Sequence, residues 1–193
     1  MQVTLPGYGK DLEEILKITR PTAPEGSLLY SIAIQIRNMA SCYVEDGAHF
    51  FKTADPVNSY ASFSYASGWL DCGHSLGFIT CHAPVPGLLF SGSDLIPYTA
   101  MPQLTEKTNR YARLLEQAVN VLVYAAEPGT LPFESAQKVL LVAEVHLRHG
   151  RVLEEECRLV PALGSYSYGH AWLDAGLRAG FFRVVSDRDL FTL

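Results

Sequence analysis

The chain has 193 residues, a net charge of −5 and a hydrophobic fraction of 48%. This length allows one domain or two small ones, and the apolar content is enough for a sizeable core. The acidic balance argues against a nucleic-acid-binding surface, which would need an excess of Lys and Arg. The start of the chain lacks the pattern of a signal peptide, and no apolar stretch approaches the length of a membrane span. We therefore expect a cytoplasmic protein with no membrane association.

The first half of the chain predicts three helices. After an opening loop or arm, apolar residues at helical spacing indicate a short amphipathic helix over 10–19. Two prolines and a glycine end it, and Ser27 is a suitable N-cap for a long helix to about residue 53. Asp55 is a suitable cap for a third helix over 56–78, which starts with a proline at the position where a helix tolerates it best.

A stretch rich in Pro, Gly and Ser follows the third predicted helix. By composition it is a linker, but its Leu, Ile, Phe and Tyr residues would be superfluous in a loose tether. We expect it to be ordered and packed across the two halves. The predicted organisation is a first helical module over 1–80, an ordered linker over 81–103 and a second, diverged module over 104–193.

The second half follows the same plan as the first. Thr105 is the expected cap of a helix to about residue 126, and a Glu-Pro-Gly-Thr turn separates it from a long helix over 131–158. A last helix is expected to end near Phe182, and residues 184–193 are expected to form a tail on the surface.

One stretch occurs twice, over residues 64–78 and 167–181, with the pattern S-Y-x-x-x-W-L-D-x-G-x-x-x-G-F. We call these two stretches the repeat motif. They contain both tryptophans of the chain, Trp69 and Trp172, which are 103 positions apart, and the match continues upstream at the same offset. The repeat predicts an all-α fold of two three-helix modules. Each module is a short helix plus a long antiparallel helical hairpin, and the two pack into one body.

Glycines inside the predicted motif helices need a physical reason. Glycine costs about 1 kcal/mol in a helix interior relative to alanine. We therefore expect Gly68, Gly73 and Gly77 to allow another helix to approach closely, with a tryptophan packed over the gap. This makes the repeat motif mainly a packing device.

The candidate binding residues are the motif positions with aromatic, hydroxyl or carboxylate groups. Asp71 and Asp174 are the only charges common to both copies, so they are where a binding or acid–base role would start. The simpler interpretation is a solvated residue or a cap for a neighbouring segment, and we favour it because no acid, base or metal ligand repeats with them. The candidates are Tyr65, Trp69, Asp71, Tyr168, Trp172 and Asp174.

Four residues within a short stretch have side chains that zinc accepts: Cys72, His74, Cys81 and His82. Their spacing fits no standard zinc motif and the second copy lacks two of them, so we predict no metal and no cofactor. The cysteines are expected to be buried thiols, with a Cys72–Cys81 disulfide left open. His146 and His149, with the glutamates around them, are explained as an exposed charged flank. The chain also lacks the common nucleotide-binding, hydrolase, metalloprotease and calcium-binding motifs.

The stretch 60–73 resembles a family of small helical proteins, the archaeal domain-of-unknown-function family number 357. Residues 43–51 and the Pro-Glu-Gly-Ser before the long helix resemble it too. The resemblance covers about 10–79 and 105–182, and the second copy departs from the pattern at its turn and within its motif. It implies a helix plus a long antiparallel helical hairpin, present as a tandem duplication. It implies no activity, cofactor or catalytic residue.

The leading functional hypothesis is a non-enzymatic scaffold or protein-interaction module, because a duplication without a repeated catalytic set resembles a fused homodimer. The alternative is a small-molecule-binding or nucleotide-binding protein, or an enzyme, with its site between the modules. Nucleic-acid binding ranks third. The sequence predicts a protein partner, without identifying it, and leaves open whether the chain forms a homo-oligomer.

Overall fold

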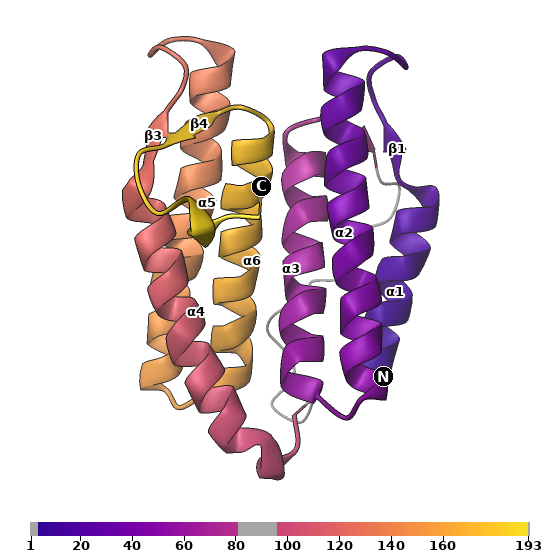
Figure 1. The fold of residues 1–193 in the computed structure, drawn as a ribbon, viewed down its shortest axis with the longest axis vertical. Helices are drawn as coiled ribbons and strands as arrows, with labels where there is room; N and C mark the ends of the chain where they lie inside the picture. The colour runs from indigo at the N-terminus through magenta and orange to yellow at the C-terminus, as the bar shows by residue number, and fades with distance from the viewer. Residues whose placement is uncertain (1–3, 81–95, 193) are drawn as a thin grey trace.

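The computed structural model describes residues 4–80 and 96–192. Six α-helices make up most of this part of the chain, three in each half (Figure 1). They are α1 (Leu5–Ile18), α2 (Leu28–Lys52), α3 (Pro56–Ser75), α4 (Met101–Val121), α5 (Leu131–Glu155) and α6 (Leu159–Arg178). Two short 3-10 helices, η3 (Tyr98–Ala100) and η4 (Arg188–Leu190), lie before α4 and near the C-terminus. The predicted all-α, two-module fold is confirmed.

Two small antiparallel ladders, absent from the sequence prediction, close the modules. β1 (Arg20–Pro21) pairs with β2 (Ile79–Thr80), and β3 (Leu122–Tyr124) pairs with β4 (Phe182–Val184). Each ladder joins the end of the first helix of a module to the end of its third helix. Strands of two or three residues are too short to show an alternating pattern in the sequence.

The hydroxyl and carboxylate caps explain where most helices begin. Ser27 Oγ accepts a hydrogen bond from Tyr30 N at 3.1 Å, and Asp55 and Thr130 cap α3 and α5 in the same way. The sequence placed two other starts wrongly. The opening segment is helical from Leu5, because Thr4 caps α1, and α4 begins at Met101 instead of at Thr105.

The two motif helices end earlier than predicted, at a left-handed glycine. Gly77 and Gly180 have φ values of +74° and +79°, which other residues rarely adopt. Phe78 N then donates to Gly73 O at 2.9 Å, which satisfies a carbonyl in the last turn of α3. Gly77 is therefore a terminator, and its predicted role in helix packing is wrong.

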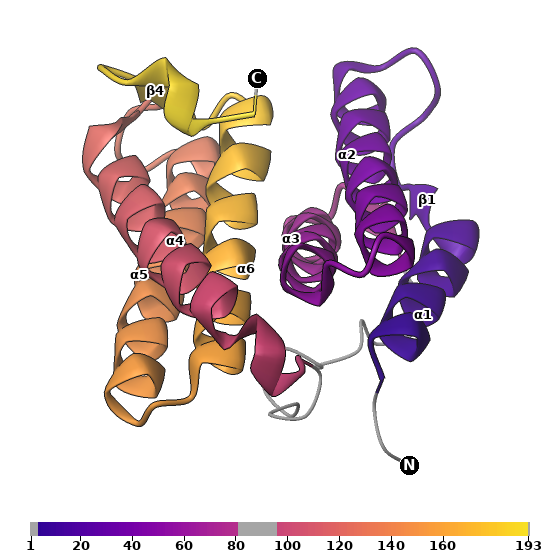
Figure 2. The same cartoon turned by 60° about the horizontal axis from the view of Figure 1, so that its bottom comes forward.

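The motif helices α3 and α6 form the seam between the modules. They run side by side in the same direction in Figure 1 and cross obliquely in Figure 2. At one end of the seam the rings of Phe78 and Phe181, which are equivalent positions of the repeat, stack with centroids 6.2 Å apart. The predicted single body with a shared core between modules is confirmed.

The first helices of the two modules pack differently. α1 lies mainly along α2, whereas α4 packs mainly on α6 (Figure 1). This leaves the two sides of the seam with unequal surroundings. No helix in residues 4–80 and 96–192 combines the length and apolarity needed to cross a bilayer. The domain boundaries stay a prediction, and most of the linker lies outside the described residues.

Candidate functional site

At Gly68 of α3 the seam has no room for a side chain. A Cβ atom added there would lie 2.6 Å from the backbone oxygen of Tyr168 and 2.7 Å from the Cβ of Ala171. No real Cβ tolerates such distances, so this glycine lets α6 approach the backbone of α3. The predicted packing role is thus confirmed for Gly68. Gly73 also lacks room for a side chain, but its neighbours are the side chains of Ile36 and Ile79 in its own module.

Two tyrosine–aspartate pairs cross the seam in a reciprocal arrangement. Tyr168 Oη donates a hydrogen bond to Asp71 Oδ2 at 2.8 Å, and Tyr65 Oη donates to Asp174 Oδ2. Each tyrosine therefore bonds to the aspartate of the other module, as an approximate two-fold relation requires. The partner of each repeated aspartate is also a motif residue, the tyrosine four positions before the tryptophan, but it comes from the opposite copy.

The favoured interpretation of the two aspartates was a solvated residue or a cap for a neighbouring segment. Asp174 is not solvated, but its carboxylate accepts from the backbone of the neighbouring C-terminal segment, as the second form expects. Asp174 is 1% exposed, and Asp71 is partly buried. Burial raises the pKa of Asp71 to about 6, against the hydrogen bond from Tyr168, which lowers it. Burial likewise raises the pKa of Asp174. Neither carboxylate forms an ion pair with Lys or Arg in the described part of the chain.

Each seam tyrosine has an aromatic neighbour from the second helix of its own module. The ring centroids of Tyr43 and Tyr65 are 4.4 Å apart, and those of His146 and Tyr168 are 4.5 Å apart. Tyr43 and His146 are equivalent positions of the repeat. The prediction of an exposed charged flank is therefore wrong for His146, whose pKa burial lowers to about 4.

The C-terminal segment covers one pair only. Thr192 N donates to both carboxylate oxygens of Asp174, at 3.3 and 3.2 Å, and its Oγ1 lies 3.3 Å from Tyr43 Oη. His170 Nε2 donates to Leu190 O at 2.8 Å, and Phe191 is buried. The tail is thus bound to the seam, which the sequence did not indicate because these contacts are irregular and distant along the chain.

A pocket of about 160 Å³ opens beside the Tyr65–Asp174 pair. Its walls come from α2, α3, α4, α6 and the tail, and include the rings of Tyr43, Tyr65, Tyr111 and His170. Of the six predicted binding residues, only Tyr65 lines it. The sequence missed the other ring residues, although Tyr43 belongs to a stretch that supports the family resemblance.

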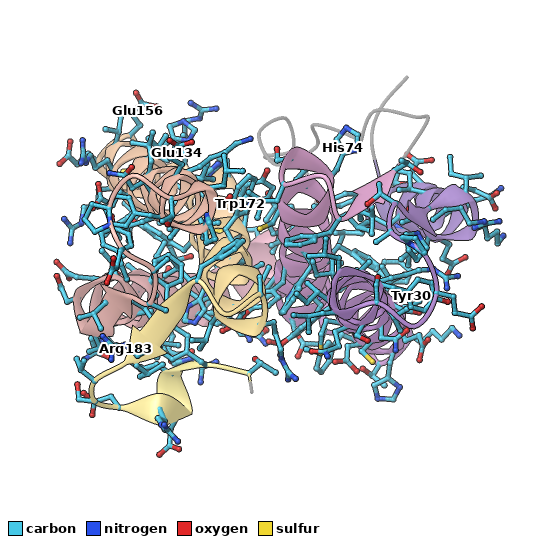
Figure 3. The ribbon with its side chains drawn as sticks, turned by 90° about the horizontal axis from the view of Figure 1, so that it is seen from above. Tyr30, His74, Glu134, Glu156, Trp172 and Arg183 are labelled. Atoms are coloured by element: carbon cyan, nitrogen blue, oxygen red, sulfur yellow. The ribbon has the colours of Figure 1, made fainter. Side chains whose placement is uncertain are left out.

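The two tryptophans contribute to the protein core. Trp69 and Trp172 are buried in the core, and neither lines the seam pocket. Figure 3 shows Trp172 in the middle of the molecule, whereas Glu134 and Glu156 lie at the outer rim of their module. A binding role for the two tryptophans stays a prediction.

The metal candidates are not gathered in the described residues. Cys72 is buried with a raised pKa, its Sγ lies 4.0 Å from Trp172 O, and His74 is exposed. Cys81, His82 and the proposed disulfide lie outside the described residues. Within the described ranges, no three His, Cys, Asp or Glu side chains are grouped to hold a metal ion. Cys42 and Cys157 are exposed free thiols, so the prediction of buried cysteines is wrong for them.

Comparison with known proteins finds one family. The model of a family described as "protein of unknown function (DUF357)" matches twice, over residues 7–79 and 110–182. The two matched segments are related by the same offset of 103 positions as the repeat motif. No curated protein and no solved structure matches the chain.

Proposed function

This chain belongs to the DUF357 family through two copies in tandem, and from that premise we propose that it is a non-enzymatic protein-interaction module. The observation that carries the proposal is the reciprocal bonding of the repeated aspartates. Asp71 and Asp174 are the only charges shared by both motifs, and each is engaged by a tyrosine of the other module. The repeat motif therefore joins the two modules of the chain, as the interface of a homodimer joins two subunits. The outer surfaces of the modules remain available for partners.

An exposed apolar stripe on α5 supports a partner surface there. Leu141, Val145 and Val152 are 58%, 49% and 49% exposed and lie on one face of the helix, at steps of four and seven residues. The equivalent positions of α2 are polar or small: Asn38, Cys42 and His49. Only one of the two duplicated helices has apolar residues at these three positions. The stripe is therefore not a general property of this helix in the repeat.

Affinity capture from native lysate, compared between two triple variants, tests the proposal. Changing Leu141, Val145 and Val152 to Ser removes the stripe, and changing Asn38, Cys42 and His49 to Ser alters the matched face of α2. We expect the wild type and the α2 variant to capture the same protein and the α5 variant to lose it. Failure of the wild type to retain any protein, or equal capture by all three forms, contradicts the proposal. Sedimentation of the pure chain shows whether the partner is a second copy.

A second candidate function is small-molecule binding, and the seam pocket favours it. The pocket lies between the modules, and its ring-lined wall adjoins a buried carboxylate. Sites of this kind often lie where domains meet. The candidate differs from the first in location, since the pocket and the α5 stripe involve different residues.

A further inference from the structure

The seam pocket has the size of one small organic group. Its volume is about 160 Å³, and an engineered cavity of about 150 Å³ in another protein accommodates benzene. A whole nucleotide is much larger than this. The pocket therefore suits a single ring or a compact branched group, or one such end of a longer molecule.

The wall of the pocket is dominated by aromatic rings. Tyr65 lies between Tyr43 and His170, with ring centroids 4.4 and 6.1 Å away, and Tyr111 contributes a further ring from α4. Ring faces carry negative electrostatic potential and attract cations. Tyr111 already shows this preference, because Lys107 Nζ lies 5.0 Å from its centroid.

The buried carboxylate of Asp174 beside the pocket favours a cation over a neutral or anionic ligand. The two cations over the ring of Tyr111, Lys107 and Arg110, lie outside the residues that line the pocket. Asp174 is 1% exposed and has no Lys or Arg ion-pair partner in the described residues. Arg178, one turn later, donates to Thr192 O at 3.2 Å instead. Tyr65 donates its hydroxyl proton to this carboxylate, which increases the electron density of the ring that faces the pocket. No Lys or Arg lines the pocket.

The opposite side of the seam provides an internal comparison. There His146 takes the place of Tyr43, and Tyr8 takes the place of Tyr111. Tyr8 is fully buried, and its Oη lies 2.6 Å from Ser67 Oγ, so this ring is packed inside its own module. The ring-lined pocket lies on the Tyr65–Asp174 side.

We propose that the seam pocket binds a quaternary ammonium group, held by the rings of Tyr43, Tyr65 and Tyr111 beside the Asp174 carboxylate. Such a group is compact, cannot donate a hydrogen bond, and is recognised through aromatic faces and a nearby negative charge. It could belong to a free small molecule or to a methylated lysine side chain. The inference deepens the second candidate function and is independent of the α5 surface.

The test is an NMR titration of the full chain with tetramethylammonium chloride, with sodium chloride at equal ionic strength as a reference. Tert-butanol, which is neutral and of similar shape, is titrated in parallel. We expect tetramethylammonium, but not tert-butanol, to shift the signals of Leu114, Leu190 and Thr192 in a saturable way. A trimethyl-lysine peptide and choline then distinguish the two sources of the group.

Variants locate the binding. Replacing Tyr111 by Leu should weaken tetramethylammonium binding about fivefold, whereas replacing it by Phe should leave binding unchanged, because the ring is retained. Tyr98→Leu is the matched control, since Tyr98 is 88% exposed and lies outside the pocket. If Tyr111→Leu alters the fold, Tyr43→Leu and Tyr43→Phe repeat the comparison from another wall.

Three results would overturn the proposal. Equal binding of tert-butanol would show a pocket without cation preference, which rejects the ligand class and keeps the second candidate function. Absence of binding by both probes would reject the site itself. Tetramethylammonium shifts that do not change in the leucine variants would show that the cation binds elsewhere.

Discussion

Both tyrosine–aspartate pairs form the same kind of hydrogen bond across the seam, but the residues around the two pairs differ. On one side Asp174 is fully covered, the tail residue Thr192 donates to it, and a ring-lined pocket lies next to it. On the other side Asp71 is partly buried, and Tyr8, the residue equivalent to Tyr111, is fully buried with its hydroxyl bonded to Ser67. After the duplication the interface contact was kept in both copies, and its surroundings diverged. A hydrogen bond that is present in both copies, although their surroundings differ, is best explained by a role in packing. The pocket on the Asp174 side is where binding is to be sought.

The largest expected effect comes from separating the two modules at Gly68, where α6 approaches the backbone of α3. Gly68→Ala should lower the free energy of unfolding by about 3 kcal/mol, because the new Cβ meets a backbone oxygen that cannot move away easily. Chemical denaturation monitored by tryptophan fluorescence measures the loss. Both tyrosine–aspartate pairs should weaken together, since Gly68 faces the centre of the seam.

The equivalent residue of the second motif supplies the control. Ala171→Gly alone should cost about 1 kcal/mol through helix propensity. Combined with Gly68→Ala it should recover only part of the loss, because removing the Ala171 Cβ leaves the Tyr168 oxygen in place. Full recovery in the double variant would show that side-chain crowding, instead of backbone approach, sets the distance between the helices.

The stability of the protein should depend on pH through Asp71. The pKa of Asp71 is about 6 in the folded chain and about 3.9 for an ordinary aspartate. Between these values the folded state binds more protons than the unfolded state, so stability falls as pH rises through this window. Above pH 6 the buried charge is a full cost, and below pH 4 the cost is absent.

Asp71→Asn should therefore stabilise the protein by about 2 kcal/mol at pH 7.5 and by nothing near pH 4. Asparagine keeps an oxygen that accepts the Tyr168 hydroxyl. Urea unfolding of both forms across this pH range gives the difference directly, and subtracting the two curves removes the effect of all other carboxylates. A difference that is constant with pH would mean that Asp71 has an ordinary pKa.

The sequence predicted the modules well because its signals there are local. Helical periodicity, the caps Ser27 and Asp55, and the motif repeated at a fixed offset all act over a few residues or by direct comparison. The role of Gly68 followed from the cost of glycine in a helix. The same logic failed for Gly77, because the sequence does not show whether a glycine near a helix end lies inside it.

The candidate site was harder to predict because it depends on contacts between the modules. The sequence supplied Tyr65 and Asp174 but not their pairing, since a periodic pattern does not show which residues meet across two helices. The pocket also needs Tyr111 from a helix that packs differently in the second module, and Thr192 from the tail. The different packing position of α4 and the binding of the C-terminal segment are not encoded by a periodic pattern in the sequence.

Removing one hydroxyl at a time measures how unequal the two pairs are. Tyr65→Phe should cost about 1 kcal/mol more than Tyr168→Phe, because it deprives the more deeply buried carboxylate of a hydrogen bond. Thermal unfolding at pH 7.5 compares the two variants. The same substitutions in chains that carry Asp174→Asn or Asp71→Asn form double-mutant cycles, which isolate each pair. Equal costs would show that burial and the tail do not distinguish the two sides.

The smallest expected effect concerns the contact between Lys138 and Ser75. Lys138 Nζ donates to Ser75 O at 2.9 Å, so a lysine of α5 caps the C-terminal end of α3 across the seam. The equivalent position in α2 is Gln35, which makes Lys138→Gln a substitution by the residue of the other copy. It should lower stability by about 0.5 kcal/mol at low salt and by less at 1 M salt, because the lysine is exposed and the attraction is screened. Lys10→Gln, an exposed lysine of α1, is the control for the loss of one positive charge. If both variants lose the same amount, the effect comes from net charge, and the contact across the seam contributes nothing measurable.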